Sequence, residues 1–409
     1  MKLLVLLVAL SVVLFGEFEY QGHVGIEAQS YILAPKDKHK NNFTAYEQLE
    51  MSYTYDSLKL ATRLYAQQDY YDAASDEKNE RTFGRVDELY GLYEFDEDAL
   101  FAGKNIRFWG ALEVRNITDT FNTQDLRNDL FNPDKMGAWN LAYSHYTDSG
   151  EFSVIIKLNE ENQKMAALPY MYYFFPAFIT YDDTLISDES LQRPTIYLSY
   201  SGMSETEYPI DYAFIVQHGY DSQRCFSADG PLNGNPVSLN ENAYLVNKVM
   251  TYNTAVIDAT LIKLEALYTD VIDNEVVSDY WHLGVGVEYT MTFDTLDGDL
   301  GLISEYYRYE TLDSEKLSDL ELFETFQNDL FVGLRYAFND ADDSSFIGGV
   351  IADLEYDEQA YYMEYETRLG DSLKLKADYR YIEPSTSDLT AYALLKRHER
   401  IGLKVAYYF

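Results

Sequence analysis

The chain ends in Ile401-Gly402-Leu403-Lys404-Val405-Ala406-Tyr407-Tyr408-Phe409. Apolar residues fall at every second position from Ile401 to Phe409, and most residues between them are small or polar. Neighbouring side chains of a β-strand point to opposite faces, so this alternation predicts a strand with one apolar face. An aromatic ending of this kind is unusual on the surface of a soluble protein, and it favours a strand that meets an apolar environment.

The same alternation recurs along most of the chain. Leu58, Leu60 and Leu64 alternate with Lys59 and Arg63. Lipid cannot satisfy charged side chains, whereas a water-filled lumen can, so this pattern is typical of a membrane barrel. A soluble β-sandwich with one buried face is the alternative. We predict an all-β fold, a transmembrane antiparallel β-barrel of about 18 strands, with about 16 or 14 left open. The strands are expected at residues 17–34, 42–55, 57–70, 82–96, 99–110, 137–147, 150–158, 193–203, 208–219, 244–254, 258–270, 278–292, 298–311, 327–339, 345–356, 359–369, 371–382 and 399–409.

The predicted connections alternate in length, which supports the barrel independently. Short connections such as Glu97-Asp98 and Gly370-Asp371 alternate with long ones such as 111–136 and 159–193. A barrel with both termini in the periplasm has long outer loops and short periplasmic turns. The tight connection Asp357-Glu358 breaks the alternation, because it falls where an outer loop is expected.

Residues 1–16 have the composition of a secretory signal peptide. Met-Lys precedes an apolar run from Leu3 to Phe15, and a small residue, Gly16, follows it. This run is too short for a comfortable membrane helix. We therefore predict a signal peptide at 1–16 and a single outer-membrane barrel domain at 17–409, with no amino-terminal plug domain. Cys225 is the only cysteine, so no intrachain disulfide is expected.

Composition excludes several classes of function. The chain has 39 Tyr and 22 Phe, and Tyr suits membrane–water interfaces. Its net charge of −38 argues against a nucleic-acid partner, because phosphate contacts need Lys and Arg. No catalytic motif is present, and His218 with Cys225 does not complete a metal site. We expect no enzyme activity, no cofactor and no metal.

The last strand resembles the carboxy-terminal assembly signal of Gram-negative outer-membrane β-barrels, with Tyr407 and Phe409 at the signal positions. This resemblance implies a location in the outer membrane. It also implies contact with outer-membrane lipid and lipopolysaccharide, and with the barrel-assembly machinery during biogenesis. A homo-oligomer is left open, since many barrels associate through their lipid faces.

A second resemblance covers about 40 residues. The stretch 103–110 reads Gly-Lys-Asn-Ile-Arg-Phe-Trp-Gly, and it is followed by Asn132-Pro133 and Trp139. It resembles a segment in the family of large outer-membrane barrels related to alginate-export porins, where a similar strand leads into a long loop. The resemblance implies a passive pore narrowed by inward-folded loops. This chain is much more acidic than an alginate exporter should be, so alginate is not carried over as the substrate.

The long connection 111–136 is a candidate constriction loop. Residues 101–140 contain five bases and five acids, which is a local charge balance of zero in a strongly acidic chain. A long outer loop of mixed charge is suited to fold into the lumen and narrow it. A solvated surface loop is the alternative, and 111–136 and 313–326 are also candidates for short helices. The predicted constriction residues are Lys104, Arg107, Glu113, Arg115, Asp119, Asp125 and Arg127.

Strand parity adds further pore-lining candidates. The residues expected to face the lumen from the strand walls are Arg63, Lys374, Lys376, Arg380, Arg400 and Lys404. We predict passive diffusion of small hydrophilic solutes or ions through this lumen. Two alternatives stay open: a substrate-specific channel for acidic saccharides or hydrophobic molecules, and a non-conducting structural or adhesive barrel. The aromatic run 171–178 is a further candidate, as a lumen lid, a rim contact or a partner-binding patch.

Overall fold

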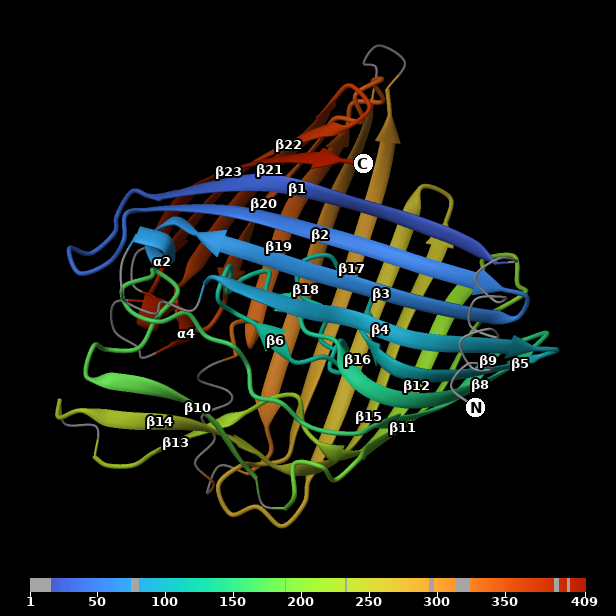
Figure 1. Ribbon diagram of the computed structural model, residues 1–409, viewed down its shortest axis with the longest axis horizontal. Helices are drawn as coiled ribbons and strands as arrows, with labels where there is room; N and C mark the ends of the chain where they lie inside the picture. The colour runs from blue at the N-terminus through green and yellow to red at the C-terminus, as the bar shows by residue number, and fades with distance from the viewer. Residues whose placement is uncertain are drawn as a thin grey trace, which may run out of the picture.

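The computed structural model describes residues 16–74, 81–187, 189–231, 234–293, 298–313, 316, 324–385, 390–395 and 398–409. Eighteen strands form one closed antiparallel sheet (Figure 1). The barrel strands are β1 Glu17–Tyr31, β2 Asn41–Tyr55, β3 Leu58–Asp69, β4 Phe83–Phe95, β5 Asp98–Asn105, β8 Ala138–Thr147, β9 Gly150–Lys157, β11 Thr195–Met203, β12 Ile210–Tyr220, β15 Leu245–Ile257, β16 Thr260–Val271, β17 Tyr280–Thr292, β18 Asp299–Thr311, β19 Asn328–Ala337, β20 Ser345–Asp353, β21 Gln359–Leu369, β22 Leu373–Glu383 and β23 His398–Tyr408. The predicted all-β barrel of 18 strands is confirmed.

The barrel closes where β23 pairs with β1. The register runs from His23 opposite Tyr408 to Tyr31 opposite Arg400. Beyond the end of β23, Phe409 and Gly22 exchange two backbone hydrogen bonds, of 3.0 and 3.1 Å. The alternate apolar residues of this last strand lie on the outer face, where Leu403 and Phe409 are 48% and 53% exposed.

The outer surface of the barrel carries an apolar belt. Exposed side chains on it include Ile26, Leu60, Val216, Val285 and Leu302. Neighbours along each strand point inward, where polar side chains can be solvated or paired. This alternation places the lipid-facing and lumen-facing residues as expected for a membrane barrel. Among the described residues, no helix has both the length and the apolar character needed to cross a bilayer.

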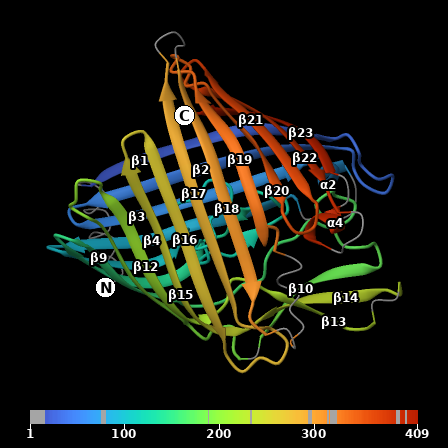
Figure 2. The same ribbon diagram turned by 180° about the vertical axis from the view of Figure 1, so that it is seen from behind.

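Tight turns join the strands at one end of the barrel. Four of these connections contain a non-glycine residue with positive φ: Asp56 at 52°, Asp96 at 49°, Asp258 at 52° and Asn339 at 54°. Asp and Asn tolerate this left-handed conformation better than most residues, which suits them to short turns. The long connections lie at the opposite end (Figures 1 and 2).

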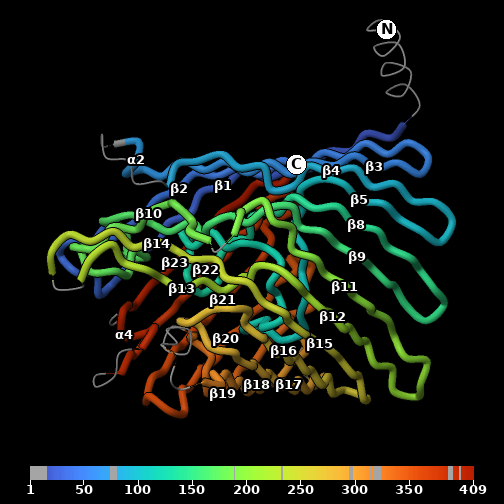
Figure 3. The backbone as a smooth tube through the Cα atoms, turned by 90° about the horizontal axis from the view of Figure 1, so that it is seen from below, coloured from blue at the N-terminus to red at the C-terminus, as the bar shows by residue number. Residues whose placement is uncertain are grey.

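Two long connections form a small sheet outside the barrel wall. β10 (Ile179–Ser187) pairs in parallel with β14 (Val237–Ala243), which pairs antiparallel with β13 (Cys225–Ala228). Figure 3 shows these strands at one side of the barrel mouth. Neither connection has a period-2 apolar pattern strong enough to predict this sheet, and β10 and β14 are distant in sequence.

Other expectations need correction. Segment 111–136 contains no helix; it contains the two-residue strands β6 (Gln124–Asp125) and β7 (Asp134–Lys135). The described short helices are instead α2 (Tyr70–Ala74) and α4 (Ala391–Leu395). The predicted strand 99–110 ends at Asn105. The predicted signal peptide 1–16, except Gly16, and most of 313–326 lie outside the described residues.

Candidate functional site: a loop that crosses the lumen

The connection between β5 and β8, residues 106–137, enters the barrel and reaches its far wall. We call it the crossing loop; it is the teal segment inside the ring of strands in Figures 1 and 3. Glu265 of β16 holds its middle. One oxygen of this carboxylate accepts the backbone N–H groups of Ala111 at 2.6 Å and Leu112 at 2.9 Å. The other accepts both the N–H and the hydroxyl of Thr118, each at 3.0 Å.

A second wall carboxylate holds the next turn of the crossing loop. Glu305 of β18 accepts the N–H of Glu113 at 2.7 Å and of Val114 at 3.1 Å. The hydroxyl of Tyr307 accepts the N–H of Arg115 at 3.2 Å and donates to Glu305 at 2.6 Å. A carboxylate that accepts backbone N–H groups forms charge-assisted hydrogen bonds, which are stronger than neutral ones. Loop backbone that would otherwise lose its water contacts is therefore satisfied.

Two glycines of β17 make room between these carboxylates. Gly284 lies opposite Glu265, and Gly286 lies opposite Glu305. The side chain of Leu112 fills the space that both lack: a Cβ atom at Gly284 would lie 2.4 Å from it, and one at Gly286 would lie 3.0 Å from it. Leu112 is 4% exposed. We call this arrangement of two acids and two glycines the wall socket.

The later part of the crossing loop is held by β22 and β23, beside the junction of β23 with β1 where the barrel closes. Asp129 accepts from Arg380 of β22 at 3.3 Å and from Arg400 of β23 at 3.1 Å. Burial alone would raise the pKa of Asp129, but the two guanidinium groups outweigh it and hold the pKa below its usual value of 3.8. Arg400 also pairs with Asp378 and donates to the Tyr172 hydroxyl at 2.6 Å.

A second loop, residues 158–178 between β9 and β10, also folds inward. We call it the aromatic loop because it contains the run Met171–Phe178. It is joined to the crossing loop by backbone hydrogen bonds between Leu126 and Lys164, at 2.7 Å, and between Lys164 and Gln124, at 3.2 Å. Tyr172 is buried, and its ring meets that of Tyr31 edge-on at 6.0 Å.

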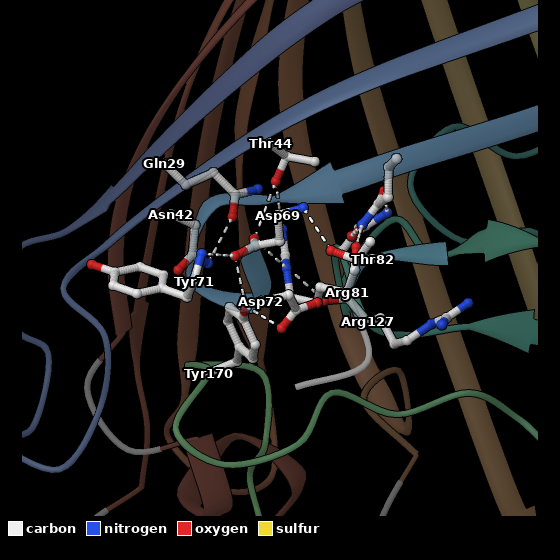
Figure 4. A network of polar contacts seen from close by, with 12 residues as sticks. Gln29, Asn42, Thr44, Asp69, Tyr71, Asp72, Arg81, Thr82, Arg127 and Tyr170 are labelled. Carbon is white, nitrogen blue, oxygen red and sulfur yellow. Dashed lines mark hydrogen bonds and ion pairs between the residues drawn. The ribbon is translucent and has the colours of Figure 1, made fainter. Parts of the chain in front are cut away.

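A buried ion pair anchors both loops to the barrel (Figure 4). Asp69, at the end of β3, accepts from Arg81 at 3.1 Å, and both side chains are almost completely buried. The hydroxyl of Tyr170, from the aromatic loop, donates to Asp69 at 2.6 Å. Arg81 donates to the backbone carbonyl of Arg127, in the crossing loop, at 2.7 Å. One pair of charges thus connects a strand end with both inward loops.

The predicted constriction residues are mostly held in internal ion pairs. Asp125 is fully buried between Arg85 at 2.7 Å and Arg127 at 2.6 Å. Glu113 pairs with Arg335 of β19 at 2.5 Å. The remaining contacts in this set are Arg115 with Glu324 at 3.7 Å and Asp119 with Lys135.

Arg107 and Lys104 occupy different environments. The Arg107 guanidinium lies 5.4 Å from the Phe101 ring and 5.5 Å from the Phe121 ring, and it donates to Asn140 at 3.1 Å. Burial lowers the pKa of Arg107 to about 10, so the charge persists at neutral pH. Lys104 instead pairs across the sheet with Leu89 and Trp139, which are exposed on the outer face. Lys104 therefore does not join the constriction residues.

The wall candidates face the lumen on the side that runs from β21 to β3. Lys374 pairs with Glu366 at 2.5 Å and Lys376 with Glu364 at 2.8 Å. Arg63 pairs with Glu50 at 2.8 Å. These six side chains are between 26% and 33% exposed, so they border open space. Lys404 lies over the Tyr46 ring at 4.3 Å.

The residues that hold the loops were not identified from the sequence. Glu265, Glu305 and Asp69 each occupy a lumen-facing position in a regular alternation, so they look like any other polar wall residue. Gly284 and Gly286 were the available signal, because two small residues on one lumen face make a wall that another backbone can approach closely. Among the described residues, no three His, Cys, Asp or Glu side chains lie close enough to hold a metal ion.

The architecture of this barrel is similar to that of several solved structures. No protein-family model matches the chain, and no curated protein matches its sequence. Solved structures do match. The structure of OccK2 (OpdF) from Pseudomonas aeruginosa in complex with glucuronate has a TM-score of 0.56 and 9% identity, covering 96% of this chain and 98% of that one. OccK5 (OpdH) from the same organism has a TM-score of 0.53 and 9% identity, with coverage of 96% and 98%.

A third similar structure is OpdQ of Pseudomonas aeruginosa, with a TM-score of 0.52, 9% identity and coverage of 96% of this chain and 98% of that chain. At such low identity these likenesses show the fold alone. The fold is that of the outer-membrane porins, a closed 18-stranded antiparallel barrel with an apolar outer belt.

Proposed function

We propose that this barrel is a porin that permits passive diffusion of small hydrophilic solutes or ions, with the crossing loop as its constriction. The proposal is supported by the hydrogen bonds that Glu265 and Glu305 of the far wall accept from the backbone of residues 111–118. A loop fixed across the lumen narrows the path without closing the barrel wall. Partly exposed charges on the wall leave a polar surface for water and hydrophilic solutes.

Charge pairing makes the proposed pore weakly selective. Lys374, Lys376 and Arg63 each have an acidic partner within 2.8 Å. A base that already faces an acid attracts a passing anion less than an unpaired base would. The same pairing does not favour the alternative of a dedicated channel for acidic saccharides. The alternative of a non-conducting barrel would require that the two inward loops close the lumen completely.

Single-channel recording tests the proposal. Refolded protein in a planar bilayer should give stable ohmic steps, and a KCl gradient should give a small reversal potential. Arg107→Gln removes one positive charge from the crossing loop and should shift the reversal potential toward cation selectivity. Lys104→Gln removes the same charge from the outer face and is the matched control. Correctly folded protein that carries no current would refute the porin proposal, and equal shifts in the two variants would remove Arg107 from the constriction.

Several expectations stay predictions. They are the signal peptide at 1–16, contact with lipopolysaccharide and with the assembly machinery, and a homo-oligomer. The relation of residues 103–139 to barrels of the alginate-export type also stays a prediction. We propose no cofactor, metal or catalytic step for this function.

A further inference from the structure

A cavity of about 420 Å³ lies between the inward loops and one sector of the barrel wall. Four phenylalanines line it, and three of them are only partly buried: Phe131 of the crossing loop, Phe174 of the aromatic loop, and Phe226 of β13. The wall supplies Ile351 of β20 and Ala360 of β21. We call this cavity the aromatic chamber. Most of its lining surface is apolar, although the lumen of a barrel is usually polar.

The volume of the aromatic chamber is too large for a packing defect. Protein interiors are close-packed, and few of their voids exceed one water molecule. Pockets that bind small molecules have volumes of roughly 300–1,000 Å³, and the chamber falls in this range. A cavity with apolar walls offers water few hydrogen bonds, and such cavities accept apolar molecules instead.

The phenylalanine rings retain surface for an occupant. Phe131, Phe174 and Phe226 are only partly buried, although they pack against clusters whose other members are fully buried. Aromatic surface left in contact with water is unfavourable, so an apolar molecule that covers three such rings would bind by the hydrophobic effect.

Four charged side chains also line the chamber, and each of them is already paired within the protein. An ionic ligand would have to compete with these pairs, whereas a neutral ligand would not. The pairs are Arg380 with Asp129 at 3.3 Å, Glu364 with Lys376 at 2.8 Å, Glu113 with Arg335 at 2.5 Å and Arg115 with Glu324 at 3.7 Å.

Two neutral amide side chains, Asn132 and Gln163, also line the chamber. They are uncharged groups that can donate or accept one hydrogen bond to a hydroxyl or carbonyl group.

We infer that the aromatic chamber binds neutral molecules with an aromatic or branched aliphatic body and a single hydroxyl or carbonyl group. The inference rests on the proposed function only in that such a ligand enters through the lumen. Because Phe131 and Phe174 belong to the two inward loops, an occupied chamber also joins these loops to the β20–β22 wall. The substrate class differs from the hydrophilic solutes that pass along the charged wall.

Calorimetric titration of the refolded barrel with 2-naphthol tests the inference, with 2-naphthoate as a charged probe of the same shape. Ala360→Phe fills the chamber from the wall and should weaken 2-naphthol binding about tenfold or more. Ala61→Phe is the matched control, because Ala61 faces the barrel lumen from β3 and does not line the chamber. Phe131→Ala removes one ring and should also weaken binding. Every variant is first shown to retain the folded form of the wild type, and its conductance is recorded separately.

The outcomes separate this inference from the porin proposal. Binding of 2-naphthol that is at least about tenfold tighter than that of 2-naphthoate and is lost in Ala360→Phe supports the chamber. Equal binding by wild type and Ala360→Phe, or tighter binding of 2-naphthoate, overturns it. If the protein conducts ions but does not bind 2-naphthol, the inference alone fails. If it binds 2-naphthol but does not conduct, the porin proposal fails and the chamber stands.

Discussion

Replacing Glu265 and Glu305 by glutamine should release the crossing loop from the far wall of the barrel. Glutamine has a similar size, but it has one acceptor oxygen, and its NH₂ group would face the loop N–H groups. Glu265 accepts four hydrogen bonds from the loop, and Glu305 accepts two. Each hydrogen bond to a charged group contributes about 1.5–3 kcal/mol.

Adding these contributions overstates the docking free energy that is lost, because water and the glutamine oxygen replace part of the hydrogen bonds. We expect the double variant to lose about 3–5 kcal/mol of docking free energy, since a neutral hydrogen bond contributes roughly 1 kcal/mol less than one to a charged group. At about 1.4 kcal/mol per factor of ten, the docking equilibrium falls between about a hundredfold and a few thousandfold. The loop should then spend measurable time away from the wall.

Two assays should report the release. Single-channel traces should show larger conductance steps and more current noise than wild type. Trypsin should cleave at Arg115 or Arg127 in the double variant and leave the docked wild-type loop intact. Glu366→Gln is the control, since Glu366 is a lumen carboxylate that pairs with Lys374 on the wall. Wild-type conductance together with resistance to trypsin in the double variant would refute the wall socket as the support of the constriction.

Three further predictions concern the stability of the inward loops. Gly284→Leu should displace Leu112 and lower the free energy of unfolding by about 1–3 kcal/mol, measured by thermal unfolding, and an unchanged midpoint would contradict the close contact. Asp69→Asn leaves Arg81 without a charged partner and should cost about 3–5 kcal/mol; a loss below about 1 kcal/mol would mean that water replaces the carboxylate. Asp129 has a lowered pKa, so its stabilisation is fully present above pH 3.8 and is lost as pH falls through the folded-state pKa. The difference in unfolding midpoint between wild type and Asp129→Asn should therefore stay constant from neutral pH down to about pH 4 and shrink below it, and a difference that shrinks near pH 6 would assign the effect to another group.

The barrel was predictable because each strand repeats the same physical requirement. Lipid on one side and water on the other impose a period of two, and short turns fix the order of neighbours. Strand ends were less predictable, since the pattern near 99–110 continues past Asn105, where the chain leaves the wall. Lys104 was predicted to join the constriction because it lies in the charge-balanced stretch 101–140, but its cross-strand partners Leu89 and Trp139 are exposed on the outer face.

The interior of the barrel was less predictable than its wall. Contacts such as Asp129 with Arg400 join residues that are far apart in sequence and follow no period. The parallel pairing of β10 with β14 is of the same kind, because a parallel pair needs a long crossover that the sequence does not mark. The length and mixed charge of the connection, together with the resemblance of residues 103–139 to porins with inward-folded loops, indicated that a loop would enter the lumen, but not where it would be held.

The contacts across the closing seam constrain the order of assembly. Tyr31 and Arg400 become neighbours only when β23 meets β1, and Tyr172 and Asp129 bind at that junction. The wall socket on β16 to β18 has no such dependence, so the crossing loop can reach it while the sheet is still open. Its other end, and the aromatic loop, gain their seam contacts only in the completed ring. The inward loops therefore gain their full set of contacts only after β23 has paired with β1. Their resistance to protease should appear late in assembly and report that the barrel has closed.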